Sequence, residues 1–100
     1  MLVYNITIRI DPAIEDEWLN WQKEEHIPEV MASGCFTGFR MYRLLETTED
    51  ELTFVIQYFA SSLEDYERYI SDTAPLLRKK VLDRWGDKFI AFRTLMEVVH

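Results

Sequence analysis

The sequence predicts an α+β fold of the ferredoxin-like type, with the element order βαββαβ and an antiparallel sheet. Three observations predict it. Residues 2–10 alternate between two strand faces, one of them fully apolar. Two helical patterns begin at N-capping residues, and each ends at a glycine, Gly34 and Gly86. No linker or short repeat interrupts the 100 residues, so we expect a single domain over residues 1–100.

The first strand and the first helix follow from the spacing of apolar residues. The strand over residues 2–10 is apolar at every second position. Asp11 and Pro12 then predict a helix start, because aspartate caps helix N-termini and proline suits the first helical position. Beyond them, apolar residues recur at i, i+4 and i+7 on one helix face: Ile14, Trp18 and Trp21.

The end of this helix is the most informative stretch of the chain. It holds two of the three tryptophans, Trp18 and Trp21, and the internal histidine His26. Proline cannot continue the hydrogen-bond ladder of a preceding turn, so Pro28 predicts that the helix bends or stops there. A short helical piece then ends at Gly34. An aromatic wall beside a titratable ring makes this corner a candidate site.

Two more strands occupy the middle of the chain. Residues 37–46 and 52–60 are dense in apolar and aromatic side chains, as strands with two covered faces are. The acidic segment 47–51 between them predicts a solvated hairpin loop. Because this connection is short, we expect the two strands to pair in antiparallel fashion.

A second helix and a last strand complete the predicted fold. Ser61 or Ser62, each with an acidic residue three positions later, predicts a capped helix start. Pro75 restarts the helix and Gly86 ends it. The last strand is expected over about residues 88–98.

A ferredoxin-like sheet carries helices on one face, so its second face is either solvated or covered by a partner. On the first strand that second face would hold Val3, Asn5, Thr7 and Arg9. The strands at 37–46 and 88–98 are apolar on both sides, so the sequence leaves open which side faces the helices. A sheet whose second face is solvated shows a cleaner alternation of apolar and polar residues than these strands do. We therefore expect a homodimer whose two open faces close into one α+β barrel.

The interior of such a barrel would be mostly apolar with a few polar groups, which is typical of a small-molecule site. Arginines converging there would bind a carboxylate or a phosphate through forked hydrogen bonds. Alternatively, they lie at strand edges and pair with the many acidic residues. Trp21 either packs in the core or stacks on an aromatic ligand. The candidate ligand-binding residues are Asn5, Arg9, Arg43, Gln57, Arg93 and Trp21.

His26 is the candidate catalytic residue. At the barrel mouth it would act as a general base or contact a ligand. The alternative is a structural histidine at a helix C-terminus, where the charged ring interacts well with the helix dipole. Glu25 or Glu29 could orient the ring, but acidic residues are frequent throughout the chain. The sequence leaves these alternatives open.

Composition argues against several classes of function. The net charge of −7 argues against nucleic acid and anionic membranes as partners. A lone cysteine, Cys35, allows no internal disulfide, and one thiol with two histidines is too few for a closed zinc site. No cofactor or metal motif is present. The start of the chain does not resemble a signal peptide, and no stretch approaches the roughly 20 apolar residues of a membrane span. We expect a cytoplasmic protein without a metal or cofactor.

With these residues in place, the chain resembles a known group. The helix end with Trp18, Trp21, His26 and Pro28, together with the element order and length, is similar to the dimeric α+β barrel superfamily. That superfamily includes antibiotic-biosynthesis-type monooxygenases and EthD-like proteins, and EthD-like members carry a tryptophan-rich helix with a His-x-Pro-like step. More closely, the chain resembles a family of short bacterial proteins described only as a domain of unknown function. The resemblance implies the barrel fold and transfers no catalytic residue.

The expected function is that of a homodimer which binds a small, partly apolar or anionic ligand in its barrel. One alternative is a cofactor-independent monooxygenase-like enzyme, with His26 as base and a barrel arginine stabilising negative charge. Another is a structural or interaction homodimer with a filled interior. The sequence leaves undecided whether the protein is an enzyme.

Overall fold

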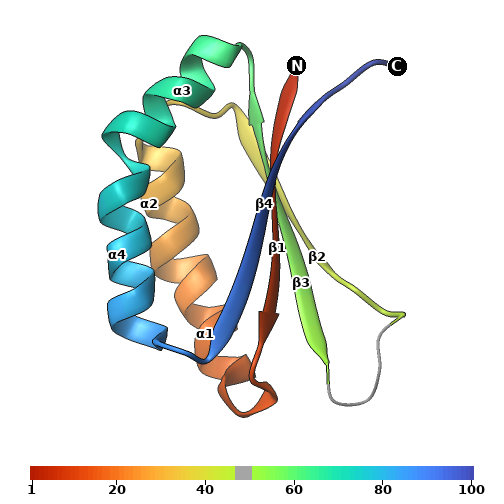
Figure 1. Ribbon diagram of the computed structural model, residues 1–100, viewed down its shortest axis with the longest axis vertical. Coiled ribbons are helices and arrows are strands. Elements are labelled where there is room, and N and C mark those ends of the chain that lie inside the picture. The colour runs from red at the N-terminus through yellow and green to blue at the C-terminus, as the bar shows by residue number, and fades with distance from the viewer. Residues whose placement is uncertain (47–50) are drawn as a thin grey trace.

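The computed structural model describes residues 1–46 and 51–100, and it has a four-stranded antiparallel sheet with helices packed on one face (Figure 1). The sheet order is β2-β3-β1-β4, with β1 and β3 in the centre. The strands are β1 (Leu2–Ile10), β2 (Gly38–Arg43), β3 (Leu52–Ala60) and β4 (Phe89–Glu97). This arrangement confirms the predicted ferredoxin-like α+β fold.

The helical layer is made of two antiparallel helical arms that lie side by side (Figure 1). The first arm runs through η1 (Pro12–Ile14), α1 (Glu15–Trp21), η2 (Gln22–His26) and α2 (Ile27–Ala32). The second arm consists of α3 (Leu63–Asp72) and α4 (Ala74–Trp85). Among the residues that the structure describes, no helix is long and apolar enough to cross a membrane.

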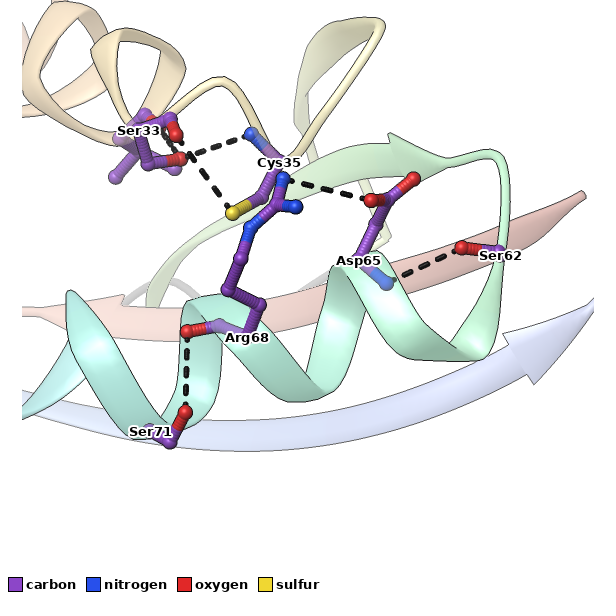
Figure 2. A network of polar contacts seen from close by, with 7 residues as sticks. Ser33, Cys35, Ser62, Asp65, Arg68 and Ser71 are labelled. Atoms are coloured by element: carbon purple, nitrogen blue, oxygen red, sulfur yellow. Dashed lines mark hydrogen bonds and ion pairs between the residues drawn. The ribbon is translucent and has the colours of Figure 1, made fainter.

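Three of the predicted helix boundaries, at Asp11, Ser62 and Gly86, are confirmed. The Asp11 carboxylate accepts a hydrogen bond from the Ala13 N–H at 2.9 Å, with Pro12 at the first position of η1. Figure 2 shows the start of α3, where the Ser62 hydroxyl oxygen accepts from the Asp65 N–H at 3.1 Å. Gly86 ends α4 with a φ of +56°, a conformation that glycine adopts without a Cβ clash.

Of the two outcomes predicted at Pro28, a bend or a stop of the helix, the structure excludes the stop, and the predicted short helical piece after it is present as α2. The backbone stays helical through Ala32, and the residues before the proline form a wide π turn, η2. In this turn the Ile27 N–H donates to the Gln22 carbonyl, five residues back. The ladder is therefore already rearranged at the point where Pro28 has no N–H to donate, so the chain continues without a break.

The register of the strands settles which side chains face the helices. On β1 and β3, Tyr4, Ile6, Ile56 and Tyr58 are buried under the helical layer. On β4, Arg93 lies opposite Ile6 and therefore shares the covered face, whereas Phe92 lies opposite Thr7 on the open face. On β2, Met41 lies opposite Ile56 and Tyr42 opposite Val55, so they too point to opposite faces. The sequence had left the facing of both edge strands open.

The core lies between the sheet and the helices, and its largest fully buried side chains are Trp18, Tyr4, Tyr58, Ile56 and Val30. Trp18 packs against Phe54 at a centroid distance of 5.0 Å, so the tryptophan helps to fasten the first arm to the sheet. The acidic hairpin loop predicted at 47–51 lies, apart from Glu51, outside the described residues.

Candidate functional site

The π turn η2 brings two polar side chains to the covered face of the sheet. Gln22 opens this turn and His26 closes it. A π turn widens the helix locally, and single π turns are frequent at functional sites because they redirect side chains. Gln22 is only 2% exposed. The His26 ring stacks on Trp21 with 4.7 Å between centroids and an interplanar angle of 17°. Stacking on Trp21 thus holds the imidazole in one orientation.

A small cavity of about 40 Å³ lies beside this turn, between the helical layer and the sheet. Its apolar walls come from strands β1, β3 and β4 and from helices α1 and α4. Its polar lining consists of Gln22, His26, Tyr58 and Arg93. An apolar cavity with a few convergent polar groups is the usual form of a small-molecule site.

Two of these polar groups are buried without a protein partner. The Gln22 Oε1 atom and the Tyr58 hydroxyl make no hydrogen bond to any described residue. Tyr58 has no exposed surface at all. A buried polar atom without a partner costs about 1–3 kcal/mol, so natural structures rarely keep one without a reason. Both atoms line the same cavity, where a ligand or water molecules can bond to them.

The charge states of the lining groups follow from their burial. The pKa of His26 is lowered from 6.5 to about 4, mainly because burial desolvates the ring; Glu29 opposes this shift, and the positive charge of Arg93 contributes to it. At neutral pH the imidazole is therefore uncharged and has one donor and one acceptor nitrogen. Burial, with smaller contributions from Tyr69 and Tyr4, raises the pKa of Tyr58, so its hydroxyl keeps its proton.

The structure brings together only two of the predicted site residues at this cavity, His26 and Arg93. Trp21 lies behind His26 and faces an outer groove between the two helical arms instead of the cavity. Arg43 also lies on the covered face but pairs with Glu15 at 2.8 Å and sits 4.8 Å above the Phe54 ring. It is therefore engaged elsewhere on that face.

The other predicted residues lie on the open face of the sheet. Gln57 Nε2 donates to the Asn5 Oδ1 atom at 3.2 Å, and the two residues face each other on neighbouring strands. Arg9 pairs with Glu51 at 2.8 Å. The predicted set is thus divided between the two faces, because the sequence could not tell which face of β4 carries Arg93.

The sequence did not predict Gln22 and Tyr58 as site residues. Gln22 follows Trp18 at i+4, so a polar side chain on the apolar helix face was the available signal. Tyr58 continues the alternation of Phe54 and Ile56, and nothing in the sequence distinguishes its hydroxyl from that of a fully bonded core tyrosine. Within the described part of the chain, no three side chains of the metal-binding types gather closely enough to hold an ion.

The comparison with protein families decides what the chain belongs to. The sequence matches a family model, Domain of unknown function (DUF4286), over residues 1–99. The chain belongs to the DUF4286 family. No curated protein matches it.

Solved structures support the fold of this DUF4286 chain. An EthD family protein from Bacillus halodurans aligns with a TM-score of 0.70 and 13% identity, over 99% of this chain and 100% of that one. An antibiotic biosynthesis monooxygenase gives 0.65 and 14%, with 100% of both chains covered. A dimeric ferredoxin-like protein from an uncultured marine organism gives 0.60 and 14%, over 99% and 96%. At such identities the likeness shows the fold alone.

Proposed function

We propose that the protein binds a small organic ligand in the cavity between its helices and its sheet. The observation that carries the proposal is the pair of buried atoms without protein partners, Gln22 Oε1 and the Tyr58 hydroxyl, which line one cavity. Their desolvation lowers the stability of the ligand-free fold. A ligand that bonds to both of them recovers this loss on binding, and the apolar walls supply the remaining affinity.

The lining groups define what such a ligand offers. Gln22 Oε1 can only accept a hydrogen bond, so it requires a donor on the ligand. The Tyr58 hydroxyl donates or accepts, and the neutral His26 ring can do either through its two nitrogens. A hydroxyl group, which both donates and accepts, matches these partners. The ligand is therefore expected to carry an uncharged hydroxyl or amide at the end that enters the cavity.

Nuclear magnetic resonance with two small probes tests the proposal. The probes are 4-hydroxyphenylacetate and its uncharged amide, each a single ring with a hydroxyl group. We expect at least one probe to shift the side-chain amide resonances of Gln22. Gln22→Leu should weaken its binding about tenfold or more, since a charge-neutral hydrogen bond and an oriented ligand are lost.

Gln57→Leu is the matched control, because Gln57 is the same residue type on the open face. It should leave the affinity within about twofold of the wild-type value. The proposal is overturned if neither probe shifts the Gln22 resonances at millimolar concentration. It is also overturned if the Gln57 variant loses affinity and the Gln22 variant does not.

The protein is also proposed to be a homodimer that pairs through its open sheet face. That face carries exposed apolar side chains on both edge strands: Phe92, which is 62% exposed, with Ile90 and Met96 on β4, and Tyr42 on β2. An apolar surface of this kind is favourable to cover. The protein of similar fold that is described as a dimeric ferredoxin-like protein supports a homodimer, without indicating which face pairs. Sedimentation should show a dimer that Phe92→Asp dissociates and that Leu76→Asp, an exposed change on α4, leaves intact.

An oxygenase-type enzyme is the second candidate, and the observation that favours it is the position of His26. The neutral ring lines the cavity on one side and the outer groove with Glu25 and Glu29 on the other. It could therefore take a proton from a bound ligand. The structural likeness to an antibiotic biosynthesis monooxygenase is consistent with this candidate. His26→Gln should then remove turnover of a ligand while its affinity changes little.

The location and the remaining partners are proposed on composition. A net charge of −7 supports the absence of nucleic-acid partners, because phosphate backbones require a basic surface. A single buried free cysteine, Cys35, is compatible with the reducing cytoplasm. Fractionation of cells that express the protein at its natural level checks the location.

A further inference from the structure

A second hollow adjoins the cavity beside the edge strand β4. It has a volume of about 220 Å³ and lies between α4 and β4. Val81, Phe89, Ala91 and Arg93 line both the cavity and this hollow. This shared lining makes the hollow the candidate entrance to the cavity, and Arg78 and Leu82 of α4 complete its lining.

The charged lining of this entrance is entirely positive. Arg78 and Arg93 line it, and no acidic side chain does. This is unexpected in a protein with a net charge of −7. Within residues 1–46 and 51–100, neither Arg78 nor Arg93 forms an ion pair, whereas four other arginines each pair with an acidic residue: Arg9, Arg43, Arg68 and Arg84. The two guanidinium groups thus keep donors for an anion.

Arg78 is held in position from inside the fold. Its Nη2 atom donates to the hydroxyl of Tyr4 at 3.0 Å, and Tyr4 is only 2% exposed. Burial, followed by the nearby Tyr4, raises the pKa of Tyr69, and the positive charges of Arg78 and Arg93 both oppose this rise. Both arginines thus lie near Tyr69 of α3, and both line the same hollow.

The cavity behind the entrance limits the part of the ligand that enters it. A volume of about 40 Å³ has room for a few water-sized groups, so only a small end group fits. Between the arginines and the buried atoms, the walls at Val81, Phe89 and Ala91 are apolar. A charged group inside would be desolvated, whereas one at the exposed entrance stays partly hydrated.

We infer that the ligand is a compact organic anion whose carboxylate or phosphate group is held by Arg78 and Arg93, while its uncharged polar end reaches Gln22 and Tyr58. This inference rests on the proposed binding function and adds the chemical class of the ligand. The guanidinium group of arginine binds a carboxylate or a phosphate through paired, charge-assisted hydrogen bonds. The apolar body of the ligand lies along Phe89 and Val81.

Calorimetric titration of the full chain with four probes tests the inference. The probes are 4-hydroxyphenylacetate, its uncharged amide, phenylacetate, which lacks the hydroxyl, and 4-hydroxybenzylphosphonate. The two hydroxylated anions should bind about tenfold or more tightly than the amide, and whichever of them binds better identifies the anionic group. Phenylacetate should bind more weakly than 4-hydroxyphenylacetate, because it leaves Gln22 and Tyr58 without a partner.

Variants locate the anion at the entrance. Arg93→Gln should remove the preference for the anions over the amide, and Arg93→Lys should restore part of it, since the charge returns without the fork. Arg78→Gln removes the hydrogen bond to the Tyr4 hydroxyl and can therefore destabilise the fold. Arg78→Lys is used beside it, because it changes the same position but retains the charge. Arg43→Gln is the matched control on the same sheet face and should leave the preference unchanged, because Arg43 pairs with Glu15.

The outcomes separate this inference from the proposed function. If the amide and the anions bind equally well and Gln22→Leu weakens both, the cavity binds ligands but the anionic class is wrong. If Arg43→Gln removes the preference for the anions and Arg93→Gln does not, the anionic group does not bind at this entrance. If no probe binds, the proposed function fails and the inference fails with it.

Discussion

The two faces of the sheet differ in two respects: whether their polar side chains have hydrogen-bond partners, and whether their apolar side chains are buried. On the covered face, Gln22 and Tyr58 are buried beside a cavity without protein partners. On the open face, Asn5 and Gln57 bond to each other at 3.2 Å. The apolar side chains show the reverse pattern, since Trp18 is 1% exposed on the covered side and Phe92 is 62% exposed on the open side.

This difference separates two kinds of surface. Polar groups that lack partners in an enclosed apolar space indicate a site for a small molecule. Apolar groups that lack cover on the open face of a sheet indicate a surface for another protein chain. The open face therefore fits the proposed dimer, and the covered face fits the proposed ligand site. Ligand binding in this scheme takes place inside each protomer, not in the space enclosed between two sheets.

Aromatic truncation on each face gives the largest expected difference. Trp18→Ala should lower the free energy of unfolding by about 3–5 kcal/mol, because it opens a cavity in the core. Phe92→Ala should have a cost that depends on protein concentration, since the open face is covered only in the dimer. Urea unfolding at two concentrations measures both. A Phe92→Ala cost that does not vary with concentration would remove the proposed role of the open face.

The pH dependence of stability measures how strongly the covered face desolvates His26. Its pKa falls from 6.5 to about 4 on folding, so the unfolded chain binds the proton more tightly. The free energy of unfolding should therefore rise from pH 4 to pH 6.5, by about 3 kcal/mol from this group, and change little above. His26→Gln should remove that contribution and His100→Gln should keep it. An unchanged slope in the His26 variant would mean that the ring is well solvated.

The smallest predicted effect compares two buried tyrosines that lie opposite each other on β1 and β3. Tyr58→Phe removes a hydroxyl without a protein partner and should raise the free energy of unfolding by about 1 kcal/mol. Tyr4→Phe removes the acceptor of the Arg78 hydrogen bond and should lower it by about 1 kcal/mol. Urea midpoints at constant slope measure both. A loss of stability in both variants would show that the Tyr58 hydroxyl is already satisfied.

The candidate site was predictable only in part. His26 and Arg93 stood out in the sequence because a lone internal histidine beside tryptophans and an arginine in an apolar strand are conspicuous. Their meeting place was not predictable, since β4 is apolar on both faces and its register with β1 decides where Arg93 points. The role of Gln22 was not predictable, because its position depends on the π turn, which no residue pattern indicates.

The sequence by itself determined the elements and their order. Alternation in β1, the Asp11 and Ser62 caps and the glycine at the end of α4 are local signals, and local signals suffice for local structure. Only the tertiary structure decided which face of each edge strand the helices cover, and that Arg78 and Arg93 line one entrance. These features depend on contacts between residues far apart in the chain, and a one-residue change in register would reverse them.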